Sequence, residues 1–233
     1  MNKYNIMKIF EIYDDLITPE EEDITRHYLK NRPHGEDKYE TEEEEYDAIG
    51  NSVESLKDKL AKIGWRCIGN GAFSLVFGNM VKPYVLKVTY ESDPGYAEYV
   101  NLIHNHPNKY FPQISDMKIL KVYDEEYHIY LIEKLKRIDF ENAMPYLQFI
   151  RKVIAEYQKP ISEIFPNGVP KNIVYNKELV KAIKLIRIHS RNTGYFIDMS
   201  SNNIMQRTDG TIVITDPYSW GSTPSGNEER YED

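Results

Sequence analysis

Acidic and amide side chains in the C-terminal third of the chain have the spacing of a phosphoryl-transfer site. Asp198 is followed five residues later by Asn203, and after a polar turn at residues 207–210 an apolar strand ends at Asp216. In phosphoryl transfer, one aspartate accepts or orients the proton of the nucleophile. An asparagine and a second aspartate hold the magnesium ions that neutralise the phosphates. About one chance match to Asp-x4-Asn is expected in a chain of this size, so the pattern needs a matching upstream half.

A glycine-rich hairpin upstream is the first candidate for that half. A strand that begins at Trp65 runs into Gly69 and Gly71, and Ser74 and Val76 lie at the start of the returning strand. Glycines without Cβ atoms let backbone N–H groups approach phosphates closely, and the small Ser74 keeps the loop open. An ordinary hairpin is the alternative interpretation of the same residues.

A lysine inside an apolar strand is the second candidate. Lys87 lies among β-branched and apolar residues. It follows the glycine-rich hairpin, eleven positions after Val76. A buried ammonium is costly without a partner, and a phosphate together with a helix carboxylate would supply one. Glu98, in an expected helix over residues 95–105, is our candidate carboxylate, and Glu91 is the rival. A solvent-facing Lys87 is the alternative.

The remaining patterns predict an α+β fold that positions these residues. Residues 65–135 predict a twisted antiparallel sheet of five short strands, with one helix between the third and fourth. The last two strands are expected over residues 117–123 and 127–135. Two apolar stripes then predict helices over residues 146–157 and 176–191, separated by a Pro/Gly-rich loop at 160–170.

The N-terminal region is predicted to be a helical and acidic extension over residues 1–63. Thr18 and the acidic residues after it have the pattern of a helix start, and a second helix is expected to end at Gly64. The acidic run at residues 36–47 fits a solvated linker or helix face, or alternatively a docking site for a basic partner. The expected domains are therefore residues 1–63, 64–135 and 136–220, followed by a polar tail at 221–233 that we expect to be disordered.

Composition excludes several classes of function. The chain has 233 residues, 41% apolar content and a formal charge of −8, which disfavours direct binding of nucleic acid. An acidic DNA mimic is also disfavoured, because the acidic run is local. The single cysteine, Cys67, excludes an internal disulfide and is expected to be a buried structural thiol. No apolar run approaches a membrane span, so we expect a soluble intracellular protein.

Taken in order, these motifs over residues 65–220 resemble a eukaryotic-type protein kinase. Within that superfamily the chain is most similar to the early serine/threonine protein kinase of short-tailed lytic bacteriophages. The stretches that carry the resemblance are Ile68-Gly-Asn-Gly-Ala-Phe-Ser, Val85-Leu-Lys-Val, Phe196-Ile-Asp-Met-Ser-Ser-Asn-Asn-Ile-Met and Ile214-Thr-Asp-Pro-Tyr-Ser-Trp220.

The resemblance implies a bilobal kinase fold, with the five-stranded sheet and one helix in the first lobe and a reduced, mainly helical second lobe. It also implies ATP and Mg²⁺ as cofactors. Asp198 would be the catalytic base, with Asn203 and Asp216 on magnesium and Lys87 on the α/β-phosphates. The residues implied to contact or brace the nucleotide are Gly69, Gly71, Ser74, Val76, Lys87, Glu98, Ile132, Glu133 and Leu135.

The resemblance further implies phosphorylation of host bacterial proteins early in infection, in the host cytoplasm. Transcription and RNA-processing machinery would be among the substrates, autophosphorylation is expected, and the result would be host transcription shutoff or blunted host defence. Neither direct nucleic-acid binding nor membrane attachment is expected.

Several departures from the kinase pattern keep a second function open. Phe196-Ile197 replace the usual His-Arg, Ser200 stands where phage relatives tend to carry histidine, and Pro217 follows Asp216. We interpret these as a kinase without an activation-loop switch. A catalytically inactive kinase-fold protein that binds a host factor is the alternative. A small-molecule phosphotransferase of the aminoglycoside-kinase type is disfavoured, because only residues 217–233 follow Asp216.

Overall fold

A computed structural model of the chain describes residues 16–31, 42–71, 73–89, 93–122 and 125–219. Contacts divide the chain into two compact units. The first contains Met1–Ser92 with Gln113–Lys134, and the second contains Asp93–Pro112 with Leu135–Asp233. Helices and strands occur in both, so the chain belongs to the α+β class, as predicted. No helix within the described ranges is both long and apolar enough to span a membrane.

The first unit contains the predicted five-stranded antiparallel sheet. Its strands are β1 (Trp65–Asn70), β2 (Ser74–Asn79), β3 (Tyr84–Thr89), β4 (Ile114–Val122) and β5 (Glu125–Glu133). Their order in the sheet is β1-β2-β3-β5-β4, and every neighbouring pair is antiparallel. β4 begins three residues earlier than the sequence indicates, because a register shift between Ile114 and Asp116 extends the pairing with β5.

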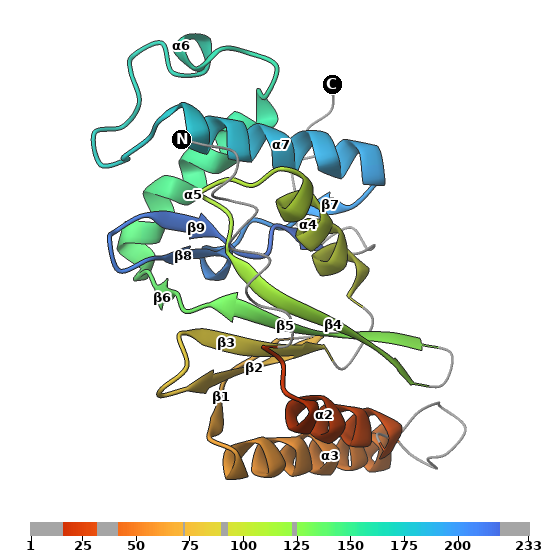
Figure 1. The fold of residues 1–233 in the computed structure, drawn as a ribbon. Coiled ribbons are helices and arrows are strands. Elements are labelled where there is room, and N and C mark those ends of the chain that lie inside the picture. The colour runs from red at the N-terminus through yellow and green to blue at the C-terminus, as the bar shows by residue number, and fades with distance from the viewer. Residues whose placement is uncertain (1–15, 32–41, 72, 90–92, 123–124, 220–233) are drawn as a thin grey trace. The chain divides into compact units, whose positions relative to one another are not determined.

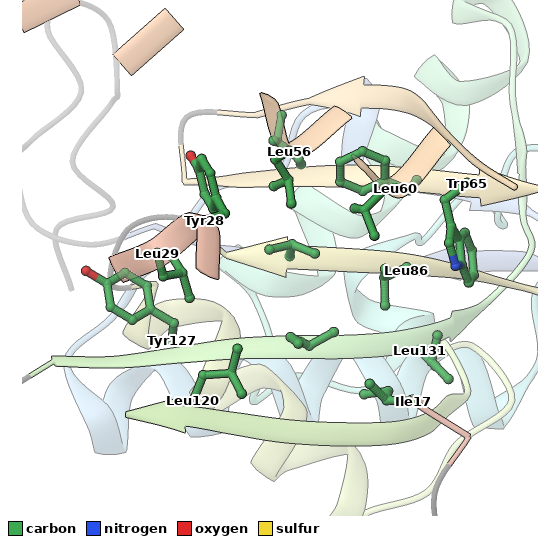
Figure 2. Close-up of a cluster of buried hydrophobic side chains, with 14 of the residues drawn as sticks. Ile17, Tyr28, Leu29, Leu56, Leu60, Trp65, Leu86, Leu120, Tyr127 and Leu131 are labelled. Carbon is green, nitrogen blue, oxygen red and sulfur yellow. The ribbon is translucent and has the colours of Figure 1, made fainter. Parts of the chain in front are cut away.

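Two N-terminal helices complete the core of this unit. Figure 1 shows α2 (Pro19–Asn31) and α3 (Glu42–Lys62) side by side. Their buried side chains join one cluster with those of the sheet, among them Leu29, Leu60, Trp65 and Leu86 (Figure 2). The region predicted as an extension therefore supplies one wall of the hydrophobic core. Of the acidic run at residues 36–47, residues 36–41 lie outside the described residues.

The second unit is built on three longer helices and two small sheets. Its helices are α4 (Pro94–Asn105), α5 (Phe140–Ala155), α6 (Ile161–Ile164) and α7 (Lys177–Thr193). Its strands are β6 (Lys136–Arg137), β7 (Phe196–Ile197), β8 (Ile204–Gln206), β9 (Ile212–Ile214) and β10 (Tyr218–Ser219). They pair in the orders β6-β8-β9 and β10-β7.

The helix boundaries of the second unit follow from capping residues. Asp93 accepts a hydrogen bond from Tyr96 N at the start of α4, and Asn176 accepts bonds from the first turn of α7. Gly194 ends α7 with a positive φ of 80°.

Three details differ from the sequence-based expectations. The loop at residues 160–170 contains the short helix α6, because the chain beyond Pro160 closes a helical turn. Cys67 is half-buried rather than buried, and its Sγ lies 3.4 Å from the Gly69 carbonyl oxygen. The predicted helix at 95–105 is confirmed as α4, but it belongs to the second unit, whereas the sheet belongs to the first.

A buried carboxylate joins the helical pair to the sheet. The Glu21 side chain is 1% exposed and accepts hydrogen bonds from Thr18 N at 2.8 Å and Trp65 Nε1 at 2.7 Å. Lys82 Nζ lies 2.6 Å from the same carboxylate. Burial alone would raise the pKa of Glu21, but the bonds from Lys82, Thr18 and Trp65 outweigh it and hold the pKa below its ordinary value.

The Glu21→Ala substitution should destabilise the protein by about 3 kcal/mol, because it leaves Lys82 and the Trp65 indole N–H without their buried acceptor. Urea denaturation of the full chain measures this change in the free energy of unfolding. The matched control is Glu20→Ala on the exposed side of α2, which should change stability by less than about 0.5 kcal/mol. Equal effects of the two substitutions would contradict the role of the Glu21 network.

The lowered pKa of Glu21 also predicts the pH dependence of stability. A carboxylate whose pKa is lower in the folded than in the unfolded state stabilises the protein above the unfolded value, about 4.3, and loses that contribution as the pH falls further. The stability advantage of the wild type over Glu21→Gln should therefore be constant near neutral pH and shrink below about pH 4. If the stability advantage of the wild type over Glu21→Gln instead grew as the pH fell, the result would contradict a lowered pKa of Glu21 in the folded state.

Candidate active site

The residues predicted to handle the proton and the metal come together in the second unit. Asp198 follows β7, and Asn203 ends the short 3-10 helix η2 (Ser201–Asn203). Asn203 Nδ2 donates to the Asp198 carbonyl oxygen at 2.8 Å, and Asp198 N donates to the Pro217 carbonyl oxygen at 2.8 Å. Thr215 N donates to the Asn203 carbonyl oxygen at 2.9 Å. These three bonds hold the chain segments that carry Asp198, Asn203 and Asp216 close together.

The side chains of this group remain accessible. Asp198 is exposed, and within the described part of the chain its carboxylate makes no hydrogen bond or ion pair, whereas Asn203 and Asp216 are half-buried. The Asp216 carboxylate and the Asn203 amide oxygen are ligand types that fit Mg²⁺, which commonly completes its shell with water and phosphate oxygens. The described residues contain no cluster of three His, Cys, Asp or Glu side chains around a metal position.

Polar side chains that the sequence analysis missed support the backbone of this group. Arg151 of α5 donates from Nη2 to the Met199 carbonyl oxygen at 2.8 Å, directly after Asp198. Tyr99 of α4 donates from its hydroxyl to the Ile214 carbonyl oxygen at 2.5 Å, two residues before Asp216. Both residues lie in predicted helices, but no motif in the sequence singles them out, so the sequence offers no separate signal for their roles.

Tyr218 in β10, two residues after Asp216, fixes the chain on the other side of this aspartate. The Tyr218 hydroxyl donates to the Ile186 carbonyl oxygen at 3.0 Å, and its ring stacks on His189 with centroids 5.6 Å apart. Burial, followed by the nearby Glu98 charge, raises the pKa of Tyr218 well above its ordinary value, so the hydroxyl remains a donor. Trp220 lies outside the described residues.

Glu98 has a neighbour within its own unit. Its carboxylate lies 3.6 Å from His189 Nε2. Burial lowers the pKa of His189 and the Glu98 charge opposes that shift, with a lowered pKa as the result. The predicted pairing of Glu98 with Lys87 stays a prediction, and the rival Glu91 lies outside the described residues.

Lys87 lies in the centre of the first unit's sheet. Its register partners are Val76 on β2 and Tyr130 on β5. Leu86 and Val88, on either side of it, point into the core beneath the helices. Because side chains alternate along a strand, Lys87 emerges on the opposite face, where it is only 6% exposed. The interpretation of Lys87 as a simple solvent-facing residue is therefore wrong.

The glycines of the hairpin are not required by the local backbone. Neither Gly69 nor Gly71 has a positive φ. A Cβ added to them would meet its nearest neighbours at 3.5 and 3.6 Å, which is ordinary contact. Gly71 N donates to the Ser74 carbonyl oxygen, which closes the hairpin, while Ala72 lies outside the described residues. Turn geometry therefore does not explain the glycines. The remaining physical reason for glycine here is that, without a Cβ atom, the hairpin backbone can be approached closely from outside.

In residues 133–135, the segment implied to contact the adenine edge, two of the three backbone N–H groups already donate hydrogen bonds within the protein. Glu133 N donates to the Gln113 carbonyl oxygen and Lys134 N to the Pro83 carbonyl oxygen, at 3.0 and 3.3 Å. Ile132 is buried, and Leu135 is half-buried. A main-chain donor for a base would therefore come from Leu135, whose N–H has no partner among the described residues.

A protein-family model matches most of the chain. The family model described as "Bacteriophage T7 protein kinase 0.7" matches residues 31–232. No curated protein matches the chain. The matched range includes the glycine hairpin, Lys87 and the Asp198–Asp216 segment.

The hydrogen bond from Tyr99 to the strand before Asp216 can be tested directly. Burial raises the pKa of Tyr99, so it stays a neutral donor, and Tyr99→Phe leaves the Ile214 carbonyl without this partner. We expect the free energy of unfolding to fall by about 1–2 kcal/mol. Tyr175→Phe is the control, because that hydroxyl has no polar partner in the described part and should matter little. Equal stability of the two variants would rule out a contribution from this bond.

Proposed function

The chain belongs to the bacteriophage T7 protein kinase 0.7 family, and on this basis we propose that it is an ATP- and Mg²⁺-dependent serine/threonine protein kinase. Its substrates are proposed to be host bacterial proteins, modified early in infection in the host cytoplasm. Transcription and RNA-processing proteins are the proposed targets, with host transcription shutoff or defence inhibition as the outcome. Autophosphorylation is proposed as a side activity.

The observation that carries this proposal is the set of bonds linking the Asp198, Asn203 and Asp216 segments. In the proposed reaction the Asp198 carboxylate accepts the proton of a substrate serine or threonine hydroxyl. Asn203 and Asp216 would hold magnesium, which would neutralise the phosphate charge of ATP. ATP would donate its γ-phosphoryl group to the hydroxyl oxygen, with ADP as the leaving group. The backbone bonds between these segments keep the base and the metal ligands in fixed positions without reorganisation during transfer.

The first unit is proposed to bind the nucleotide, which would make the fold a bilobal, kinase-like one. Lys87 would donate to the α/β-phosphates, and a lysine 6% exposed in a sheet is suited to this role because burial keeps competing water away. Gly69, Gly71, Ser74 and Val76 would lie over the phosphates. The proposed adenine contacts are Ile132, Glu133 and Leu135, with Leu135 N–H as the donor. Glu98 is proposed to brace Lys87.

A second candidate function is a catalytically inactive kinase-fold protein that binds a host factor. The altered residues before the catalytic aspartate favour it, because Phe196 is exposed and provides no charge near Asp198. An inactive descendant would however be expected to lose Lys87, Asp198 or Asp216, all of which are present.

Phosphoryl transfer from labelled ATP to a generic protein substrate separates the two candidates. Asp198→Asn should lower the rate by about 10³-fold, because it removes the base while preserving shape. Asp209→Asn in the neighbouring hairpin is the matched control. Asp209 caps its turn by accepting from Thr211 N, a bond that asparagine also makes, so this variant should keep full activity.

A thermal-shift measurement with Mg·ATP gives an independent result. A ligand at 100 times its Kd should stabilise the protein by about 2.7 kcal/mol. Absence of both stabilisation and transfer in the wild type would contradict the enzyme proposal and favour the binding protein.

A further inference from the structure

The second unit contains a pocket that the proposed reaction does not use. Its volume is about 400 Å³, and it lies where strand β6, the first turns of α5, the loop before α7 and the end of β8 meet. The side chains that matter for its chemistry are those of Arg137, Asp139, Glu141, Tyr146, Asn172 and Gln206.

The walls of this pocket are fixed by bonds within the unit. Val174 N donates to the Tyr146 hydroxyl at 3.2 Å, and the Tyr175 ring packs on Phe149 of α5 with centroids 5.9 Å apart. Gln206 is held by pairing of β8 with β6. These bonds hold the backbone around the pocket in place, so a ligand loses little binding energy to ordering of the chain there.

Hydrogen-bond acceptors without partners converge on this pocket. The Glu141 carboxylate and the Asn172 side chain make no hydrogen bond or ion pair within the described ranges. Pro145 lies inside α5 and has no N–H, so the Glu141 carbonyl oxygen lacks its usual helical donor. Gln206 donates its amide N–H to the Gly210 carbonyl oxygen, which leaves the Gln206 side-chain oxygen as an acceptor.

The charges of the pocket favour a cationic ligand. Asp139 and Glu141 provide two carboxylates against the single guanidinium of Arg137. Hydrogen bonds from Asn142 hold the pKa of Asp139 below its ordinary value, so this carboxylate is charged at neutral pH. The whole chain carries a formal charge of −8, which favours basic partners.

The rim of the pocket favours a polypeptide over a small cation. Phe140, between the two acidic residues, is 65% exposed, and Val174, bonded to Tyr146, is 76% exposed. Exposed apolar side chains next in the chain to pocket residues, or bonded to them, suit a peptide whose neighbouring residues are apolar. The Arg137 guanidinium, which has no partner among the described residues, can donate to main-chain carbonyls of such a peptide.

We propose that this pocket binds an arginine or lysine side chain of a protein substrate, with Glu141 as the specificity-determining carboxylate. That the bound protein is a substrate rests on the proposed kinase function, whereas the binding of a basic side chain does not. The occupant is an extended basic segment of the partner, and the pocket would select hydroxyl residues that lie within reach of such a segment.

Binding is tested by fluorescence anisotropy with the full chain and no nucleotide. The probe is a labelled short peptide of alanine, glycine and one serine with a single arginine, and its matched partner carries neutral citrulline instead. The arginine peptide should bind about tenfold more tightly, as expected for one charge-assisted contact. Glu141→Gln should remove that tenfold preference, while Glu163→Gln, an exposed carboxylate on α6, should preserve it. A preference that is absent from the wild type, or that survives in Glu141→Gln, overturns the proposal.

Phosphorylation of the same two peptides separates this proposal from the proposed function. A lower KM for the arginine peptide that rises about tenfold in Glu141→Gln, with kcat unchanged, supports both. Equal KM values for the two peptides with normal turnover would overturn the pocket and leave the kinase intact. Selective binding with no transfer to any substrate would leave the pocket intact and overturn the kinase.

Discussion

The proposed site depends on the hydrogen bonds that join the segment after β7 to the end of β9. Asp198 N to Pro217 O and Thr215 N to Asn203 O are backbone bonds, so they hold the two segments together whatever the side chains do. Tyr99 and Arg151 then fix these segments to α4 and α5. A phosphoryl-transfer site gains most from such fixed positions, because its chemistry requires charges to be in place before the reaction begins.

The first unit meets a different constraint, that of placing a lysine in an apolar sheet. The α2–α3 pair covers one face of the sheet, and Glu21 joins that pair to Trp65 and Lys82. Alternation along β3 then directs Lys87 to the other face. The N-terminal helices thus stabilise the strand that carries Lys87, although none of the predicted site residues lies in them.

Local patterns in the sequence predicted much of this structure. The five strands, the cap at Asn176 and the close grouping of Asp198 with Asn203 follow from alternation, capping chemistry and short spacing. Contacts between distant segments could not be predicted, because no local pattern records them. The packing of α2 and α3 on the sheet, the Tyr99 bond across 115 residues and the membership of α4 in the second unit belong to this class. The pocket at Glu141 is also of this kind, since it is formed by three separate stretches of the chain.

Labelling with an acyl-phosphate derivative of ATP tests the central claim most directly, because this probe acylates the lysine beside the bound phosphates. The account predicts that mass spectrometry finds Lys87 as the main labelled lysine. Excess Mg·ATP should suppress the labelling, and so should Asp216→Asn, which weakens metal-assisted nucleotide binding. Labelling spread over exposed lysines such as Lys136 and Lys177, and insensitive to ATP, would contradict the claim that Lys87 and Asp216 serve one nucleotide.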